Sequence, residues 1–232
     1  MDKLSPNHDA RPAGQAIDIL LLHYTGMASA QAALDRLCDS AAKVSAHYCI
    51  DEDGGVLRLV PEHRRAWHAG ASSWAGDADV NGRSIGIELV NPGHEFGYRP
   101  FTDAQMAALI DLAHGVLKRH PIPPHRVLGH SDVAPLRKED PGELFDWPAL
   151  AVAGIGLWPG TPTPLGALPS QAEVKAALAR FGYGYLDEDF PAVVRAFQRR
   201  FRPKALTGEV DGETAARLFA LLAPLDGTSG GP

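Results

Sequence analysis

The segment from Gly154 to Pro169 most constrains how this chain can fold, because it is too rich in proline and glycine for a regular helix or strand. It contains the run W-P-G-T-P-T-P-L-G-A-L-P, and each proline fixes φ and removes a backbone donor. Such a segment is typical of a linker or an extended strap between two folded units. We therefore predict two domains, residues 1–153 and 170–224, joined by 154–169 and followed by a flexible tail at 225–232.

Short apolar runs and helical patterns alternate in the first domain. Strands are predicted at 17–22, 44–50, 56–60 and 84–90, with a hairpin turn at 51–55. Ser29 can cap one helix, and Thr102 and Gln105 can form a capping box at the start of another. Strands and helices that alternate without a strict repeat predict an α/β (α+β) fold, in which helices flank a mixed central sheet.

Three shorter helical patterns follow the linker, at 171–181, 191–201 and 212–222. Ser170 and Glu173 can form a capping box on the first of them, Gly182 can end it, and Asp211 can cap the third. The second domain is therefore predicted to be a compact three-helix module, small enough to be only marginally stable alone.

Composition argues against several classes of protein. The net charge of the 232 residues is −6, whereas nucleic-acid binding favours a basic face. Cys38 and Cys49 form no C-x-x-C pair, so two free thiols are expected. No segment approaches the ~18 apolar residues of a membrane helix, and the first residues lack the apolar region of a signal peptide. We expect a monomer in the cytoplasm, or in the periplasm if a signal peptide has been removed.

The stretch from Gly129 to Gly142, G-H-S-D-V-A-P-L-R-K-E-D-P-G, holds two possible metal ligands, His130 and Asp140. A surface turn is the ordinary interpretation of such a loop. However, imidazole and carboxylate are standard zinc ligands, and a catalytic zinc needs three protein groups. His23, at the end of a buried strand, is the candidate for the third ligand.

Two further residues fit hydrolysis. Glu88 lies in S-I-G-I-E-L-V between apolar neighbours, where burial would raise its pKa towards that of a general base; an exposed edge-strand glutamate is the alternative. Lys138, two positions before Asp140, can stabilise negative charge on an attacked carbonyl oxygen, although a surface lysine is the alternative. Asp132 is predicted to shape the loop or to support the ligands.

Five motifs in order resemble the N-acetylmuramoyl-L-alanine amidase family, which includes the bacterial AmpD and AmiD enzymes and, more distantly, phage amidases and peptidoglycan recognition proteins. They are L-L-H-Y-T-G, V-S-A-H-Y, R-A-W-H-A-G, S-I-G-I-E-L and G-H-S-D-V-A-P-L-R-K-E-D-P-G, within about residues 15–150. The resemblance implies a mixed sheet with helices on its faces and one zinc on His23, His130 and Asp140. It also implies that Glu88 is the catalytic base and Lys138 the cation that stabilises the oxyanion.

The resemblance further implies the substrate. It is the amide between the lactyl group of N-acetylmuramic or anhydro-muramic acid and L-alanine of the stem peptide, in muropeptides or murein, and cell-wall recycling is the expected process. His47, Trp67 and His68 would lie near this substrate. A non-catalytic recognition protein on the same fold is one alternative, although such proteins typically lack the third ligand, which Asp140 supplies here. A zinc peptidase that cuts within the stem peptide is another.

The three-helix module resembles a peptidoglycan-binding domain in A-V-V-R-A-F-Q-R-R-F and G-E-V-D-G-E-T-A-A-R-L. It departs from the usual pattern between Tyr183 and Asp189. It could bind glycan, or it could only pack on the catalytic domain. The module and the opening S-P-N-H-D-x-R-P resemble the AmiD branch, which acts on the wall in the periplasm. The absence of a signal-like segment instead favours cytoplasmic recycling of anhydro-muropeptides.

Overall fold

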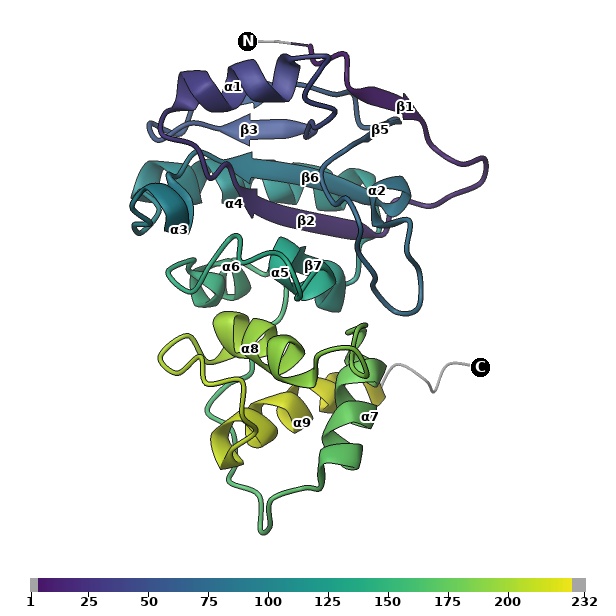
Figure 1. Ribbon diagram of the computed structural model, residues 1–232, viewed down its shortest axis with the longest axis vertical. Helices are drawn as coiled ribbons and strands as arrows, with labels where there is room; N and C mark the ends of the chain where they lie inside the picture. The colour runs from purple at the N-terminus through teal and green to yellow at the C-terminus, as the bar shows by residue number, and fades with distance from the viewer. Residues whose placement is uncertain (1–3, 227–232) are drawn as a thin grey trace.

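The computed structural model describes residues 4–226 (Figure 1). A five-stranded sheet with strand order β4-β3-β6-β2-β7 lies at the centre of the first domain. β3, β6, β2 and β7 run parallel to one another, and the edge strand β4 pairs antiparallel with β3. The bounds are β2 (Ile19–Tyr24), β3 (Tyr48–Ile50), β4 (Val56–Arg58), β6 (Ser84–Leu89) and β7 (Val127–Gly129). The predicted mixed sheet flanked by helices is confirmed.

The alternation of side chains along the strands gives the two faces of the sheet different surroundings. Leu20 and Leu22 of β2 pack with residues of α4 (Asp103–Arg119) on one face. Successive side chains of a strand point to opposite faces, so His23 points away from α4. His23 and Glu88 are partners in the parallel register of β2 and β6, and they therefore share the face opposite α4.

Helix caps explain where the longer helices of the first domain begin. α1 (Ala30–Cys38) starts after Ser29, whose side chain accepts a hydrogen bond from the Ala32 N–H at 3.2 Å. Thr102 and Gln105 form the predicted capping box of α4. Short elements fill the connections: β1 (His8–Ala10), β5 (Arg64–Ala66), α2 (Val80–Arg83), α3 (Gly93–Phe96), a 3₁₀ turn (Pro124–Arg126), α5 (His130–Val133) and α6 (Trp147–Val152). β1 pairs antiparallel with β5.

The second domain consists of α7 (Gln171–Phe181), α8 (Phe190–Phe201) and α9 (Gly212–Asp226). Ser170 and Glu173 form a capping box on α7, which Gly182 ends, and Asp211 accepts a hydrogen bond from the Thr214 N–H at 2.9 Å. Residues 154–169 contain neither helix nor strand. Of the predicted tail 225–232, residues 225 and 226 belong to α9 and the others lie outside the described residues.

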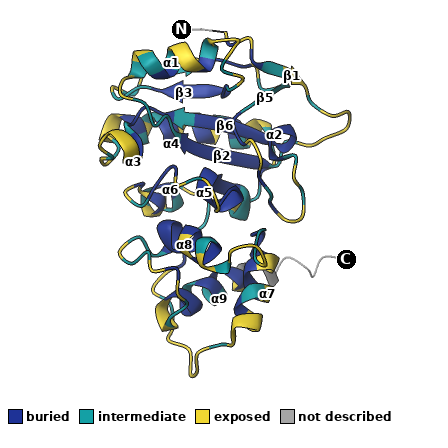
Figure 2. Cartoon of the chain, in the orientation of Figure 1, coloured by how far each residue is buried: buried dark blue, intermediate teal, exposed yellow. Residues whose placement is uncertain are grey.

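One hydrophobic core joins the two domains. Ile19 and Leu21, on the face of β2 opposite α4, belong to the same buried cluster as Phe181, Phe197 and Phe201 of the three-helix module. α8 lies directly beneath α5 in Figure 1, and the facing parts of both are dark blue in Figure 2. The module therefore covers part of the sheet face on which His23 lies.

The strand predicted at 44–50 starts only at Tyr48, because Ser45 hydrogen-bonds the backbone of Trp67, outside the sheet. Within residues 4–226, no helix combines the length and the apolar character needed to cross a membrane.

Candidate metal centre and active site

Three buried side chains converge at one end of the sheet. The Nδ1 atoms of His23 and His130 are 3.0 Å apart, and Oδ2 of Asp140 lies 3.0 Å from each of them. His23 lies in β2, His130 begins α5, and Asp140 follows in the loop after α5. A tetrahedral zinc with bonds of about 2.0 Å separates its ligand atoms by about 3.3 Å, so the spacing of this trio suits such an ion.

A chain of hydrogen bonds sets the tautomer of His23. The Ser84 hydroxyl donates to the Val80 carbonyl at 2.7 Å, so its oxygen is free to accept from Nε2–H of His68 at 3.2 Å. Nδ1 of His68 can then accept from Nε2–H of His23 at 3.1 Å. This leaves Nδ1 of His23 without a proton, as a metal ligand requires.

A hydrogen bond also sets the tautomer of His130, the second histidine of the trio. Nε2–H of His130 donates to the Ala69 carbonyl at 3.0 Å, which leaves the Nδ1 lone pair directed at the trio. Burial and neighbouring His130 lower the pKa of His23 to about 4, so its ring is neutral. Burial alone would raise the pKa of Asp140, but its two histidine neighbours hold that pKa below its usual value. Two imidazole nitrogens and one carboxylate oxygen therefore face one another, and these are donor types that suit a divalent cation such as zinc.

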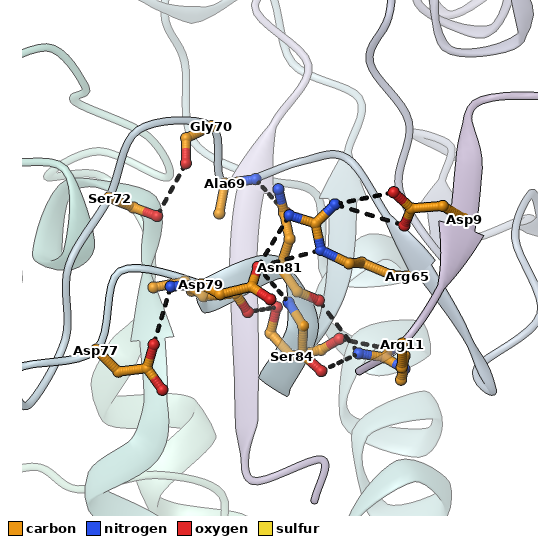
Figure 3. A network of polar contacts seen from close by, with 12 residues as sticks. Asp9, Arg11, Arg65, Ala69, Gly70, Ser72, Asp77, Asp79, Asn81 and Ser84 are labelled. Carbon is orange, nitrogen blue, oxygen red and sulfur yellow. Dashed lines mark hydrogen bonds and ion pairs between the residues drawn. The ribbon is translucent and has the colours of Figure 1, made fainter. Parts of the chain in front are cut away.

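The loop Trp67–Gly70 supports both histidines, and α2 holds this loop. Oδ1 of Asn81 accepts from the backbone N–H of His68 at 3.0 Å and of Ala69 at 2.8 Å, and Asn81 lies against Ala69 in Figure 3. A Cβ on Gly86 would lie 2.5 Å from the His68 ring. Only glycine at this position of β6 therefore leaves room for the ring behind His23.

Glu88 supplies an uncommitted carboxylate beside the trio. Its Oε2 is buried and has no hydrogen-bond partner among the described residues. Burial raises the pKa of Glu88 well above its usual value, and the nearby charge of Asp140 adds to this, while Lys138 opposes it. A more basic carboxylate that opens onto a cleft is suited to accept a proton.

A cleft of about 400 Å³ opens over these groups. Glu88, His130, Lys138 and Asp140 line it. The other described lining residues include Tyr24, Arg36, Trp67, His68, His94, Arg137 and Glu139.

The structure separates the three residues that the resemblance placed near the substrate. Trp67 and His68 line the cleft, and the His68 ring also contacts His23. His47 is fully buried and is not among the described residues that line the cleft. Its Nδ1 accepts from the Gly86 N–H at 2.9 Å. Burial, followed by the charge of Arg11, lowers the pKa of His47 to about 3.

Sequence reasoning missed the supporting residues of the site. No helix was predicted between the strands at 56–60 and 84–90, yet α2 lies there and provides both the Val80 carbonyl and the Asn81 amide behind His68. Ser84 appeared only as the first residue of a strand. The alternation along β6, which places Ser84 and Gly86 on the face of Glu88, was the available signal.

Comparisons with known proteins agree with this geometry. The sequence pattern of the family described as N-acetylmuramoyl-L-alanine amidase matches residues 13–143, and that of a putative peptidoglycan binding domain matches residues 169–218. The chain belongs to the N-acetylmuramoyl-L-alanine amidase family. The resemblance inferred from the five motifs is thereby confirmed.

Relatives of this amidase fall into two kinds by coverage. The amidase AmiD of Escherichia coli is 38% identical over 95% of this chain and 87% of its own length. The 1,6-anhydro-N-acetylmuramyl-L-alanine amidase AmpD of Haemophilus influenzae is 35% identical, but over 62% of this chain and 85% of its own length. Two solved structures match nearly the whole fold, each with a TM-score of 0.81. They are the AmiD complex (37% identity, 92% of each chain) and an AmpDh3 complex from Pseudomonas aeruginosa (33% identity, 96% of this chain and 98% of that chain).

Proposed function

We propose that this chain hydrolyses the amide between the lactyl group of muramic acid and L-alanine in muropeptides. The observation that carries the proposal is the convergence of His23, His130 and Asp140 beside Glu88, whose Oε2 has no hydrogen-bond partner within residues 4–226. Two solved relatives support the substrate class. The AmiD structure holds the substrate anhydro-N-acetylmuramic acid-L-Ala-D-gamma-Glu-L-Lys, and the AmpDh3 structure holds an anhydromuramic pentapeptide.

The trio would hold one zinc ion through two imidazole nitrogens and one carboxylate oxygen, the donor types that zinc prefers. When bound, zinc polarises the amide carbonyl and lowers the pKa of water. The residues of this chain fix the position of the ion, because Ala69 and His68 hold the two rings in the tautomers that present Nδ1.

Glu88 and Lys138 would carry the proton and the charge. Glu88 accepts the proton of the attacking water as the C–O bond forms, and it returns a proton to the L-alanine nitrogen as the C–N bond breaks. Lys138, on the wall of the same cleft, stabilises the negative charge on the carbonyl oxygen of the tetrahedral intermediate. The products are a free muramic acid carboxyl group and a stem peptide with a new L-alanine amine.

The direct test is the release of stem peptide from purified muropeptides, measured with and without a chelator. We expect cleavage that stops on chelation and returns when zinc is added. Glu88→Gln should lower the turnover by at least ~10²-fold while zinc binding remains. Undiminished cleavage by Glu88→Gln would overturn the assignment of the base.

The same assay separates the alternatives. Binding of muropeptide without turnover or zinc would indicate a recognition protein, and a new amine on an internal residue of the peptide would indicate a peptidase. A comparison of anhydro and ordinary muropeptides would test the role in cell-wall recycling. The cytoplasmic location stays a prediction, which fractionation of cells would test.

A further inference from the structure

A buried carboxylate in the zinc-ligand loop has its partners in the other domain. Asp132, in α5, is 1% exposed. Its Oδ2 accepts from the Gly129 N–H and from Nη1 of Arg200, both at 2.8 Å. Its Oδ1 accepts from the Tyr183 hydroxyl at 2.5 Å. Arg200 and Tyr183 belong to the three-helix module, so the module is hydrogen-bonded to α5, the helix that begins with His130.

Arg200 is committed to this contact. It is 2% exposed, and its guanidinium lies 4.2 Å from the centre of the Trp147 ring. Among the described residues, its Nε and Nη2 have no hydrogen-bond partner, and Asp132 is its ion-pair partner. Removing one member of such a buried pair leaves the other charge uncompensated. The pair is therefore a fixed point between the two domains.

Tyr183 is fixed just as firmly by the first domain. The residue before it, Gly182, accepts at its carbonyl from the Ala75 N–H at 2.8 Å. A Cβ on Gly182 would lie 2.4 Å from the Trp74 ring, so only glycine allows this approach. Tyr183 thus contacts the catalytic domain both through its hydroxyl and through the backbone of the residue before it.

The geometry of α5 connects the hydrogen bonds at Asp132 to the proposed zinc ligands. α5 is only four residues long, so Asp132 and His130 belong to the same helical turn. The Ser131 N–H, between them, donates to the Asp140 carbonyl at 2.9 Å. A displacement of α5 therefore moves His130 directly and Asp140 through this hydrogen bond.

We propose that Arg200 and Tyr183 are positioning residues for the zinc ligands. The three-helix module is thus part of the catalytic unit, because its hydrogen bonds to Asp132 hold α5 in place. The inference rests on the proposed zinc site. It predicts that zinc affinity, and not only stability, depends on residues of the module.

The test is the zinc dissociation constant of the full chain, measured by competition with a chromophoric chelator, together with the thermal unfolding of the zinc-free protein. Arg200→Met should weaken zinc binding about tenfold, the lower end of what partners behind metal ligands contribute. Tyr183→Phe, which removes one hydroxyl, should weaken it about threefold. If Arg200→Met does not fold, Tyr183→Phe alone decides.

Two control variants separate positioning from general stability. Arg195→Met makes the same change at an exposed position of α8, and it should leave zinc affinity within twofold of wild type. Leu218→Ala opens the core of the module at a residue of α9 that makes no hydrogen bond or ion pair with Asp132, and it should lower the unfolding temperature without weakening zinc binding. Wild-type zinc affinity in both Arg200→Met and Tyr183→Phe would overturn the inference, as would an equal loss in Leu218→Ala. A wild-type chain that binds no zinc would instead refute the proposed function.

Discussion

The proposed zinc ligands His23, His130 and Asp140 are supported from two sides that differ in kind. On one side, the loop Trp67–Gly70 meets the histidine rings directly, through the His68 ring and the Ala69 carbonyl. On the other side, Arg200 and Tyr183 hold the backbone of the ligand loop through Asp132. The first, the inner support, is formed by neutral groups within the catalytic domain. The second, the outer support, includes the charged pair of Asp132 and Arg200, which are 68 positions apart in the sequence.

The two supports act on different properties of the proposed metal site. The inner support sets the tautomer of each ring, which a metal site requires whatever surrounds it. The outer support acts only on position. AmpD of Haemophilus influenzae aligns with 62% of this chain, so an amidase of this family need not match the whole of it. We expect the inner support to contribute more to zinc affinity than the outer one.

Removal of a ligand sets the scale for the comparison. Asp140→Asn keeps the shape of the side chain but removes its charge from the trio. Zinc affinity should fall by more than ~100-fold, beyond the range of supporting residues, and muropeptide cleavage should be lost. Zinc retained after dialysis against a chelator measures the effect. Asp111→Asn, on the exposed side of α4, is the control, and retention of zinc by Asp140→Asn would remove this aspartate from the ligand set.

Loss of the inner support should have the next largest effect. In His68→Ala the Nε2–H of His23 loses its acceptor, so the tautomer that presents Nδ1 is no longer favoured. Zinc affinity should fall ~10- to 100-fold, as measured by chelator competition. His63→Ala, at an exposed position, should change nothing. An affinity for His68→Ala within twofold of wild type would show that the inner support is dispensable.

A change one step further from the metal should act on stability as well. Asn81→Ala leaves the backbone N–H groups of His68 and Ala69 without their acceptor. At about 1–3 kcal/mol for each buried donor, the unfolding temperature should fall by roughly 5–15 °C. Zinc affinity should fall about tenfold, less than in His68→Ala. Calorimetry on Asn81→Ala, with the exposed Gln31→Ala as control, would contradict this if the two unfold alike.

A partly exposed ion pair between the domains should have the smallest effect. Arg199, whose side chain is 7% exposed, pairs with Glu139 at 2.9 Å, but the Glu139 side chain is 52% exposed and Glu143 also lies 3.6 Å from Arg199. Exposed pairs contribute about 0–1 kcal/mol. Glu139→Gln should therefore leave zinc affinity within about twofold of wild type, although Glu139 is the neighbour of Asp140 in the sequence. A larger loss, measured by the same competition, would mean that the outer support does not depend on the buried pair.

Much of the site could be predicted because it follows from local pattern. The buried run before His23, the apolar neighbours of Glu88 and the spacing of His130 and Asp140 are all visible in the sequence. Strand alternation and register then place His23 beside Glu88. The caps at Ser29, Thr102 and Ser170 also follow from local chemistry, and the structure confirms them.

The supports could not be predicted because they depend on tertiary packing. No local pattern shows that Asp132 meets Arg200, or that Trp74 meets Gly182, since the partners lie in different domains. His47 and His68 both stand in motifs of the family resemblance, yet His47 is buried against the backbone of β6 and His68 contacts the ring of His23. Only the fold distinguishes the two.

The zinc dissociation constant of the double variant His68→Ala/Arg200→Met tests the central claim most directly. If the two supports hold the trio independently, their free-energy effects add. The loss in affinity should then be the product of the two single losses, about 100-fold or more when each is about tenfold. A double variant that binds zinc as tightly as His68→Ala alone would contradict the account, because the module would then have no part in holding the zinc ligands.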